Sequence, residues 1–192
     1  MEPRTLALPL VVFLAAVLAG CSGLSTGENL PVSPRHCEQG SIPDQELRAS
    51  LRQAAAGETQ ELLLALRSTN GTLQLALLSP QGLPLYRIVC NKSGPQVSVQ
   101  SGSELVVSPL EMLGYLELAL ATPASLAVAL RPGWSLEELD GNRRFRKAGD
   151  NLEISIDYGT KEGKPGHVQV EDVDKGIRLV LRVLGGSRVV SE

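Results

Sequence analysis

The stretch LLLALRSTNGTLQLAL (residues 62–77) decides the fold class of this chain. Leucine recurs at 62, 64 and 66 and again at 73, 75 and 77, the period of two that half-buried strands show. Asn70-Gly71 between the two runs is the pair that a tight hairpin turn with positive φ favours. The stretch therefore predicts two antiparallel strands joined by a short turn.

Further hairpins are expected on both sides of this one. Ser79-Pro80-Gln81-Gly82 predicts a second turn, and alternating apolar residues follow at 86–90, 97–99, 152–158 and 177–183, with turns at 92–94, 140–142 and 163–166. Residues 46–54 fit either a strand or one helix face, and we favour a strand. Consecutive hairpins imply a mainly antiparallel sheet.

Two short helices are expected between these strands. Ser108, Pro109 and Glu111 supply an N-cap, a first-turn proline and a capping box, and an apolar stripe follows to residue 120. Thr122-Pro123 restarts the pattern up to residue 130. The joined segment 105–130 is apolar, but its two prolines and two glutamates argue against a membrane span.

The N-terminus has the layout of an export signal. A basic residue and an apolar run precede Leu18-Ala19-Gly20-Cys21, which resembles the lipobox of bacterial lipoproteins. That resemblance implies cleavage before Cys21 and acylation of Cys21 as a lipid anchor. We therefore expect a signal peptide at 1–20, an acylated cysteine and flexible tether at 21–44, a domain at 45–186 and a tail at 187–192.

The remaining cysteines, Cys37 and Cys90, can form one disulfide, which an exported protein permits. The alternative is a buried Cys90 that acts as a small apolar residue, with Cys37 free in the tether. Two cysteines and two histidines do not suffice for a convincing zinc site. We predict the Cys37–Cys90 bridge and no metal.

Composition excludes several functions. The chain has 18 basic and 21 acidic residues, so the net charge of −3 indicates no basic face and no nucleic-acid binding. Aromatic residues make up 3% of the chain, so the core must be aliphatic. No catalytic or cofactor motif is present, and Glu137, Glu138 and Asp140 beside Trp134 are interpreted as a solvated loop. We predict a protein that is not an enzyme and needs no cofactor.

The order of lipobox, tether, hairpins, helical pair and final strands resembles a family of uncharacterised bacterial lipoproteins often encoded with aryl-polyene or related lipid biosynthesis genes. More distantly it is similar to LolA and LolB, the periplasmic carrier and outer-membrane receptor of lipoproteins. The resemblance covers residues 45–184. It implies a mainly β (α+β) fold, in which a half-open, curved antiparallel sheet has two short helices as a lid over an apolar cavity.

The leucines of the strands and helices are compatible with this implied cavity. Its expected lining, an aliphatic surface suited to acyl chains, is Leu64, Leu75, Leu113, Leu116, Leu126 and Leu130. The same leucines could instead pack the helices onto the sheet as a solid core, with no cavity left. Both readings stay open at this point.

One turn departs from the LolB pattern. In LolB the corresponding turn carries an exposed leucine that helps deliver lipoproteins into the membrane, whereas Gln81 occupies the matching position here. Leu83 follows the glycine and is expected to belong to the next strand. Because a polar amide gains little in an acyl layer, LolB activity is not expected.

These observations favour an outer-membrane lipoprotein whose periplasmic domain binds or shuttles a lipid-like molecule. Ser22, rather than an aspartate, follows Cys21, which by the family's sorting rule favours the outer membrane. The expected partners are the membrane through the N-terminal anchor, the lipid-like ligand and a periplasmic carrier or export complex. The alternative is a non-enzymatic accessory lipoprotein of an envelope complex without a small ligand.

Overall fold

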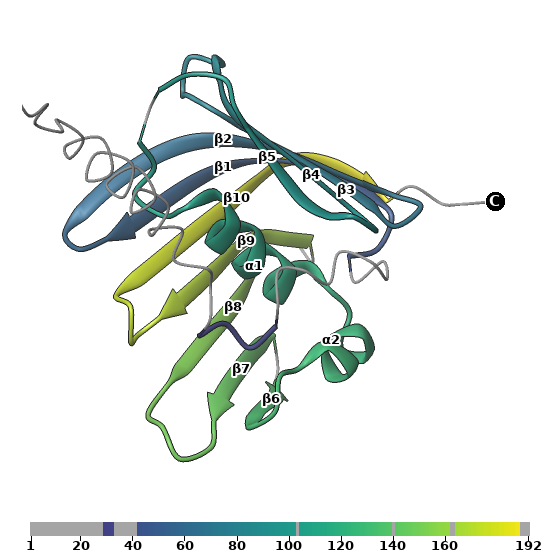
Figure 1. Cartoon of the computed structure of the whole chain (residues 1–192), viewed down its shortest axis with the longest axis vertical. Coiled ribbons are helices and arrows are strands. Elements are labelled where there is room, and N and C mark those ends of the chain that lie inside the picture. Colours follow the sequence, from purple (N-terminus) through teal and green to yellow (C-terminus); the bar gives the residue numbers. More distant parts are fainter. Residues whose placement is uncertain (1–28, 33–41, 103, 140, 162–163, 189–192) are drawn as a thin grey trace, which may run out of the picture.

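The computed structural model describes residues 29–32, 42–102, 104–139, 141–161 and 164–188 (Figure 1). The strands and helices follow one another as β1 (Gln45–Ala55), β2 (Glu58–Thr69), β3 (Thr72–Leu78), β4 (Pro84–Asn91), β5 (Gly94–Val99), α1 (Pro109–Leu120), α2 (Pro123–Ala129), β6 (Trp134–Leu139), β7 (Asn142–Lys147), β8 (Glu153–Lys161), β9 (Lys164–Asp172) and β10 (Ile177–Arg188).

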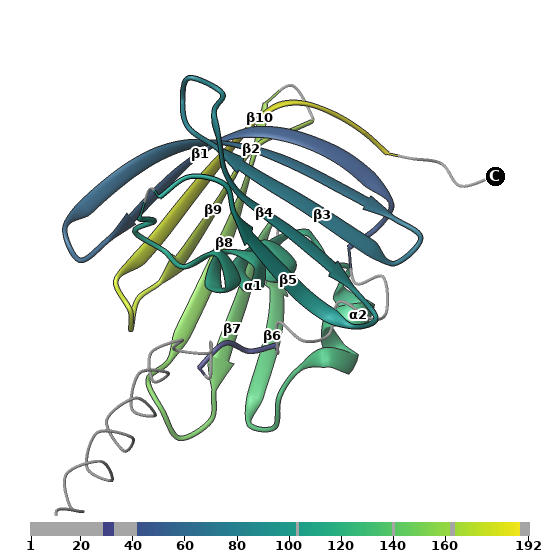
Figure 2. The ribbon, with the colours of Figure 1, turned by 45° about the horizontal axis from the view of Figure 1, so that its top comes forward.

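The strands form one antiparallel sheet in the order β5-β4-β3-β2-β1-β10-β9-β8-β7-β6. Strands that follow one another in the chain pair from β1 to β5 and from β6 to β10, and β1 pairs with β10 at the central seam. The sheet is strongly curved and stays open between its edge strands, β5 and β6, with α1 inside the arch (Figures 1 and 2). The predicted fold, a mainly β domain with an open, curved antiparallel sheet and two short helices, is confirmed.

The turns explain why the chain folds into hairpins. Asn70 and Gly71 adopt φ of 49° and 72°, so the predicted turn joins β2 to β3. In the next turn Gly82 has φ of 84°, and its N–H donates to the Ser79 carbonyl at 2.8 Å. Residues 45–55 form strand β1, which resolves the earlier choice between strand and helix.

Three sequence interpretations are wrong. Glu137 and Glu138 do not lie in a loop but in edge strand β6, which carries too few buried residues to show a clear alternation. Leu83 is not part of the next strand, because β4 begins at Pro84, and 64% of Leu83 is exposed in the turn. Gly166 belongs to β9 rather than to the preceding turn.

The core lies on the inner, concave face of the sheet. Alternate residues of the central strands point inward, for example Leu62, Leu64 and Leu66 of β2 and Leu73, Leu75 and Leu77 of β3. Helix α1 is buried on all sides from Met112 to Ala119, as expected of a helix that occupies the interior. By contrast, Leu126 is the one buried residue of α2.

Residues 29–32, which the sequence assigns to the tether, pack against the helices. Leu30 and Val32 are fully or almost fully buried, and Val32 pairs with Leu130 in an isolated antiparallel bridge. The Arg131 N–H also donates to the Pro31 carbonyl at 2.9 Å. This short segment, here called the strap, therefore lies against the helical part of the chain and is part of the packed core.

Candidate functional site

The predicted ligand-binding leucines are brought together around α1. Leu64, Leu75, Leu113, Leu116 and Leu126 are each at most 2% exposed, and Leu130 is partly buried against the same cluster. Leu75 of β3 faces Leu66 of β2 across the ladder, next to Leu64, so the strand residues form one aliphatic surface. Because these side chains belong to one core cluster, an acyl chain could reach this surface only if α1 moved outward.

Polar contacts fix the N-terminal end of α1 to the sheet. The Ser108 hydroxyl accepts from the Glu111 N–H at 3.3 Å, which confirms the predicted N-cap. Glu111 in turn pairs with the Lys175 ammonium of the β9–β10 turn at 2.7 Å. Just before the helix, the Val107 N–H donates to the buried Gln53 side chain of β1 at 3.3 Å.

A buried hydrogen bond joins the middle of α1 to β9. The Tyr115 hydroxyl donates to Asp172 Oδ2 at 2.7 Å, and both residues are shielded from solvent. Burial, followed by the hydrogen bond to Asp172 and the negative charges of Asp172 and Glu111, raises the pKa of the Tyr115 hydroxyl far above its ordinary value. The hydroxyl is therefore a neutral donor that satisfies a carboxylate inside the core.

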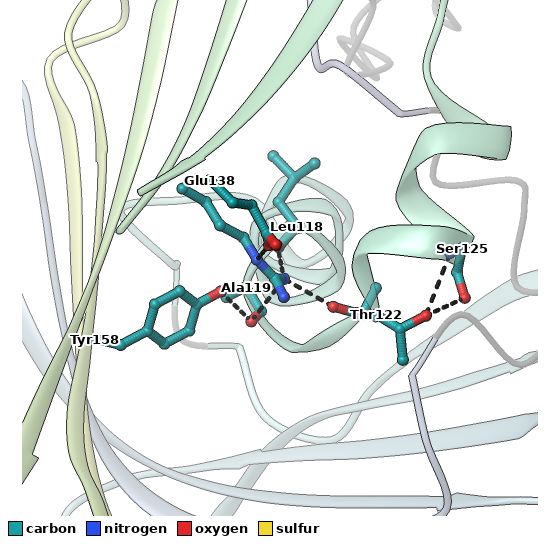
Figure 3. A network of polar contacts seen from close by, with 8 residues as sticks. Leu118, Ala119, Thr122, Ser125, Glu138 and Tyr158 are labelled. Atoms are coloured by element: carbon teal, nitrogen blue, oxygen red, sulfur yellow. Dashed lines mark hydrogen bonds and ion pairs between the residues drawn. The ribbon is translucent and has the colours of Figure 1, made fainter. Parts of the chain in front are cut away.

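The C-terminal end of α1 is held by two side chains from β7 and β8 (Figure 3). Arg143 Nη1 donates to the carbonyls of Ala121 at 2.7 Å and Leu118 at 3.1 Å. Tyr158 donates its hydroxyl to the Ala119 carbonyl at 2.6 Å. These carbonyls belong to the last turn of α1 and the residue after it, where a cation also complements the helix dipole.

Arg143 and Tyr158 also support each other. The guanidinium lies 5.3 Å from the centre of the Tyr158 ring, and Arg143 Nε pairs with Glu138 Oε1 at 2.6 Å. Burial raises the pKa of Tyr158 to about 12, which Arg143 opposes and Glu138 reinforces. We call Arg143 and Tyr158 the carbonyl clamp, because together they bind the free carbonyls of α1.

The sequence did not predict the carbonyl clamp or the Tyr115–Asp172 bond. Arg143 lies on an exposed edge hairpin, and a chain pattern does not reveal which helix carbonyl a distant side chain reaches. Tyr115 is one of the buried residues of α1, and the spacing of those residues does not show that its hydroxyl has a partner. A tyrosine among leucines was the one available hint, since a buried tyrosine hydroxyl usually finds a partner.

Of the three cysteines, the described residues include Cys90, so the cysteine predictions can be compared with the structure there. Cys90 is fully buried on β4 and is disulfide-bonded. The other two cysteines of the chain, Cys21 and Cys37, lie outside the described residues, so the Cys37–Cys90 pairing stays a prediction. The acylation of Cys21 also falls outside them.

The described residues lack two further kinds of feature, a cluster of metal ligands and a helix that could span a membrane. In these ranges no three His, Cys, Asp or Glu side chains gather as metal ligands. Neither of the two helices described is both long and apolar enough to cross a membrane.

Fold and site define a class of protein in which an open antiparallel sheet wraps around one buried helix. Within this class the chain belongs to DUF3261, a family described as proteins of unknown function, whose model matches residues 44–185. Comparison with curated proteins found no match.

Two solved structures are similar to this chain. One is a LolA superfamily protein from Nitrosomonas europaea, with a TM-score of 0.39 and 11% sequence identity over 79% of this chain and 88% of that chain. The other is a DUF1329 family protein from Desulfovibrio piger, with a TM-score of 0.34 and 11% identity over the same shares.

Proposed function

We propose that this domain binds a lipid-like molecule, such as an acyl chain, on the leucine-rich inner face of its open sheet. The proposal rests on the way in which α1 covers that face. The helix lies over the leucines and is held to the sheet by polar contacts at both ends and in the middle. Aliphatic surface beneath a removable cover suits long flexible chains, which need area rather than directional contacts.

The contacts of α1 make its movement physically reasonable. The ion pair of Glu111 with Lys175 and the contacts of Arg143 lie near the ends of the helix, where water can replace them when they separate. The inner contacts of α1 are aliphatic and have little directional preference, so an acyl chain can replace them. The cost of opening then falls mainly on the Tyr115–Asp172 bond.

The proposal includes an anchor and a location. Acylation of Cys21 would hold the domain at the periplasmic face of the outer membrane, within reach of acyl groups on lipids or lipoproteins. An aryl polyene is a second hydrophobic candidate ligand, although its conjugated chain is stiffer than an acyl chain, and a periplasmic carrier or export complex would deliver the ligand. The second candidate, an accessory lipoprotein without a small ligand, is favoured by the close packing of the same leucines.

The carbonyl clamp gives a direct test. In the chain from residue 22 onward, Arg143→Gln should weaken the closed position of α1 and raise the apparent affinity for a fluorescent C16 fatty acid, because more of the protein is competent to bind. Arg144→Gln is the matched control, since Arg144 neighbours Arg143 on β7 but pairs with Glu153 instead of α1.

Fluorescence titration and lipid extraction with mass spectrometry separate the two candidate functions. The lipid-binding proposal expects fatty acid in the extract of the wild-type protein and tighter binding by Arg143→Gln alone. If neither protein binds the fatty acid and Arg143→Gln lowers only the thermal stability, the accessory role is the better description.

A further inference from the structure

The outer, convex side of the sheet carries a concentration of arginine that the net charge conceals. On β1, β2, β4, β9 and β10 the residues between the inward-pointing ones include six arginines and three glutamates, namely Arg48, Arg52, Arg67, Arg87, Arg178, Arg182, Glu46, Glu61 and Glu171. The net charge of the whole chain therefore does not describe the charge of this side of these strands. The arginines are distant in the sequence and meet through strand pairing.

A hollow of about 950 Å³ lies on this side, over β2, β1, β10 and β9. Its charged lining is Arg52, Arg178, Arg182 and Glu61, together with His167, and we call it the arginine hollow. Its apolar lining includes Leu63, Val180 and Pro80 of the β3–β4 turn. This volume is typical of sites for small molecules.

Strand register brings the three arginines to one place. Arg52 of β1 lies opposite Val180 of β10, and Arg178 and Arg182 are two residues to either side of Val180. Both are therefore diagonal neighbours of Arg52, at the separation that long side chains can bridge. A ligand in the arginine hollow could contact all three guanidinium groups.

The charges of the lining are not balanced internally. Arg52 pairs with Glu61 at 2.5 Å, and Arg178 donates to the Gln169 amide oxygen at 3.0 Å. Arg182 forms no ion pair in the described part of the chain. A further acid, Glu171, stands opposite Arg178 in the ladder but does not line the hollow. Among the described lining residues, three arginines against one glutamate leave two positive charges.

Polar residues lie opposite Arg182 on both neighbouring strands. Ser50 and His167 are the ladder partners of Arg182 on its two sides, and both line the hollow. The ring of His167 occupies the space that a Cβ atom would take on Gly159 of β8, so the imidazole has room there because residue 159 is glycine. Ser50 and His167 thus line the hollow from the two strands next to the one that carries Arg182.

A second hollow of about 240 Å³ on the same side has a similar composition. Its lining contains Arg48, Arg67, Arg87 and Glu46, again three arginines and one glutamate. Among the described residues of the two linings there is no lysine and no aspartate. Arginine presents a planar, forked donor set that matches phosphate oxygens in a bidentate manner, which lysine cannot do.

We propose that the arginine hollow is a binding site for a phosphate group, carried either by a lipid headgroup or by a soluble phosphorylated molecule. Arg52, Arg178 and Arg182 bind the phosphate oxygens, and the Ser50 hydroxyl and His167 add hydrogen bonds. A phosphate monoester carries between one and two negative charges at neutral pH, which matches the two positive charges of the lining. This site lies on the side of the sheet opposite α1 and does not depend on the proposed acyl-chain site.

Binding can be measured on the full chain held in phosphatidylcholine nanodiscs. Isothermal titration with pyrophosphate and with dihexanoyl phosphatidic acid, a soluble short-chain lipid, tests the two sources, and dihexanoyl phosphatidylcholine is the zwitterionic control. Binding of both anionic probes shows that the phosphate group alone is recognised. Binding of the lipid alone assigns the headgroup as the source, and binding of pyrophosphate alone assigns a soluble ligand.

Substitutions test the named residues. Arg182→Gln should weaken binding of the anionic probes at least tenfold. Arg182→Lys should restore binding only in part, because lysine supplies the positive charge but not the forked donor set of arginine. Arg146→Gln is the matched control, since Arg146 is an exposed arginine on β7 outside the hollow. The proposal is overturned if neither anionic probe binds, or if Arg146→Gln weakens binding as much as Arg182→Gln while both variants keep the wild-type melting temperature.

Discussion

The side chain of Leu30 fills the space next to Gly114 in which a Cβ atom would otherwise lie. Gly114 is in the middle of α1, where glycine is an unfavourable helix residue, and Leu30 belongs to the strap and is fully buried. The missing side chain on the helix thus allows the strap to approach it closely.

This relationship predicts that Gly114→Ala lowers the free energy of unfolding when Leu30 is present and raises it when residue 30 is alanine. Gly114→Ala alone should destabilise the protein by about 1–2 kcal/mol, because overpacking against a buried leucine outweighs the gain in helix propensity. Leu30→Ala should cost about 2–5 kcal/mol through the cavity it leaves. When Gly114→Ala is added to Leu30→Ala, it should be stabilising. Urea unfolding of the four proteins measures the coupling, and additive effects would show that the two residues do not compete for space.

The raised pKa values of Tyr115 and Tyr158 predict a loss of stability at high pH. Folding favours the neutral hydroxyl of Tyr115, so its contribution is complete below the unfolded-state pKa of about 10 and is lost as the pH rises above it. The free energy of unfolding should then fall by close to 1.4 kcal/mol per pH unit, and Tyr158 adds to this loss until about pH 12. Unfolding free energies measured from pH 9 to 11 should decline less steeply for Tyr115→Phe. An equal slope in the two proteins would contradict the role of Tyr115.

Leu116 tests the inner face of α1. Leu116→Ala should lower the unfolding free energy by about 2–5 kcal/mol, because the side chain is fully buried, and should also reduce fatty-acid binding by the chain from residue 22. Val128→Ala on α2 is the control, since Val128 is 81% exposed and its change should stay within about 0.5 kcal/mol. Unchanged stability of Leu116→Ala would show that the helix is not packed as described.

The β3–β4 turn carries an apolar group after all, because Leu83 is exposed beside Gln81. If this turn contacts lipid, Leu83→Gln should weaken vesicle binding of the chain from residue 22, and Gln81→Leu should strengthen it, with about 1.5–3 kcal/mol available from full burial of a leucine. Leu184→Gln is the matched control, since Leu184 on β10 is 66% exposed. Equal losses for Leu83→Gln and Leu184→Gln in vesicle sedimentation would remove any special role of the turn.

The disulfide of Cys90 predicts a redox-dependent stability. If its partner is Cys37, the bridge closes a loop of about 50 residues, and reduction should lower the unfolding free energy by about 4 kcal/mol in the chain-entropy model. Alkylation of the denatured, non-reduced chain from residue 22 should label neither thiol. Labelling of both would refute the pairing, and Cys90→Ala should then cost no more than the cavity it leaves.

Local sequence was sufficient for the elements whose residues alternate clearly. Leu62–Leu66 and Leu73–Leu77 each have one buried face, and the Asn70-Gly71 turn between them requires positive φ, so the hairpin could be predicted residue by residue. The caps at Ser108 and Thr122 likewise marked the starts of both helices.

Features that depend on pairing between distant segments could not be predicted. Leu30 lies in a stretch without periodicity, and its burial depends on the missing Cβ of Gly114. Arg52 and Arg182 are neighbours only because β1 pairs with β10. Strand β6 was missed because an edge strand with half-buried Trp134 and Leu136 and otherwise exposed residues lacks a strong alternation.

The seam between β1 and β10 has a consequence for how the protein is made. During synthesis β1 emerges before every other strand described, and its partner β10 emerges after all of them. Until then one edge of β1 exposes unpaired N–H and C=O groups, which can pair with another copy of the chain. Closing the seam also brings together residues more than 120 positions apart, such as Ala54 and Arg178, so we expect it to be the slow step of folding. A nascent or newly exported chain would therefore be most prone to aggregation just before its last twelve-residue strand is complete.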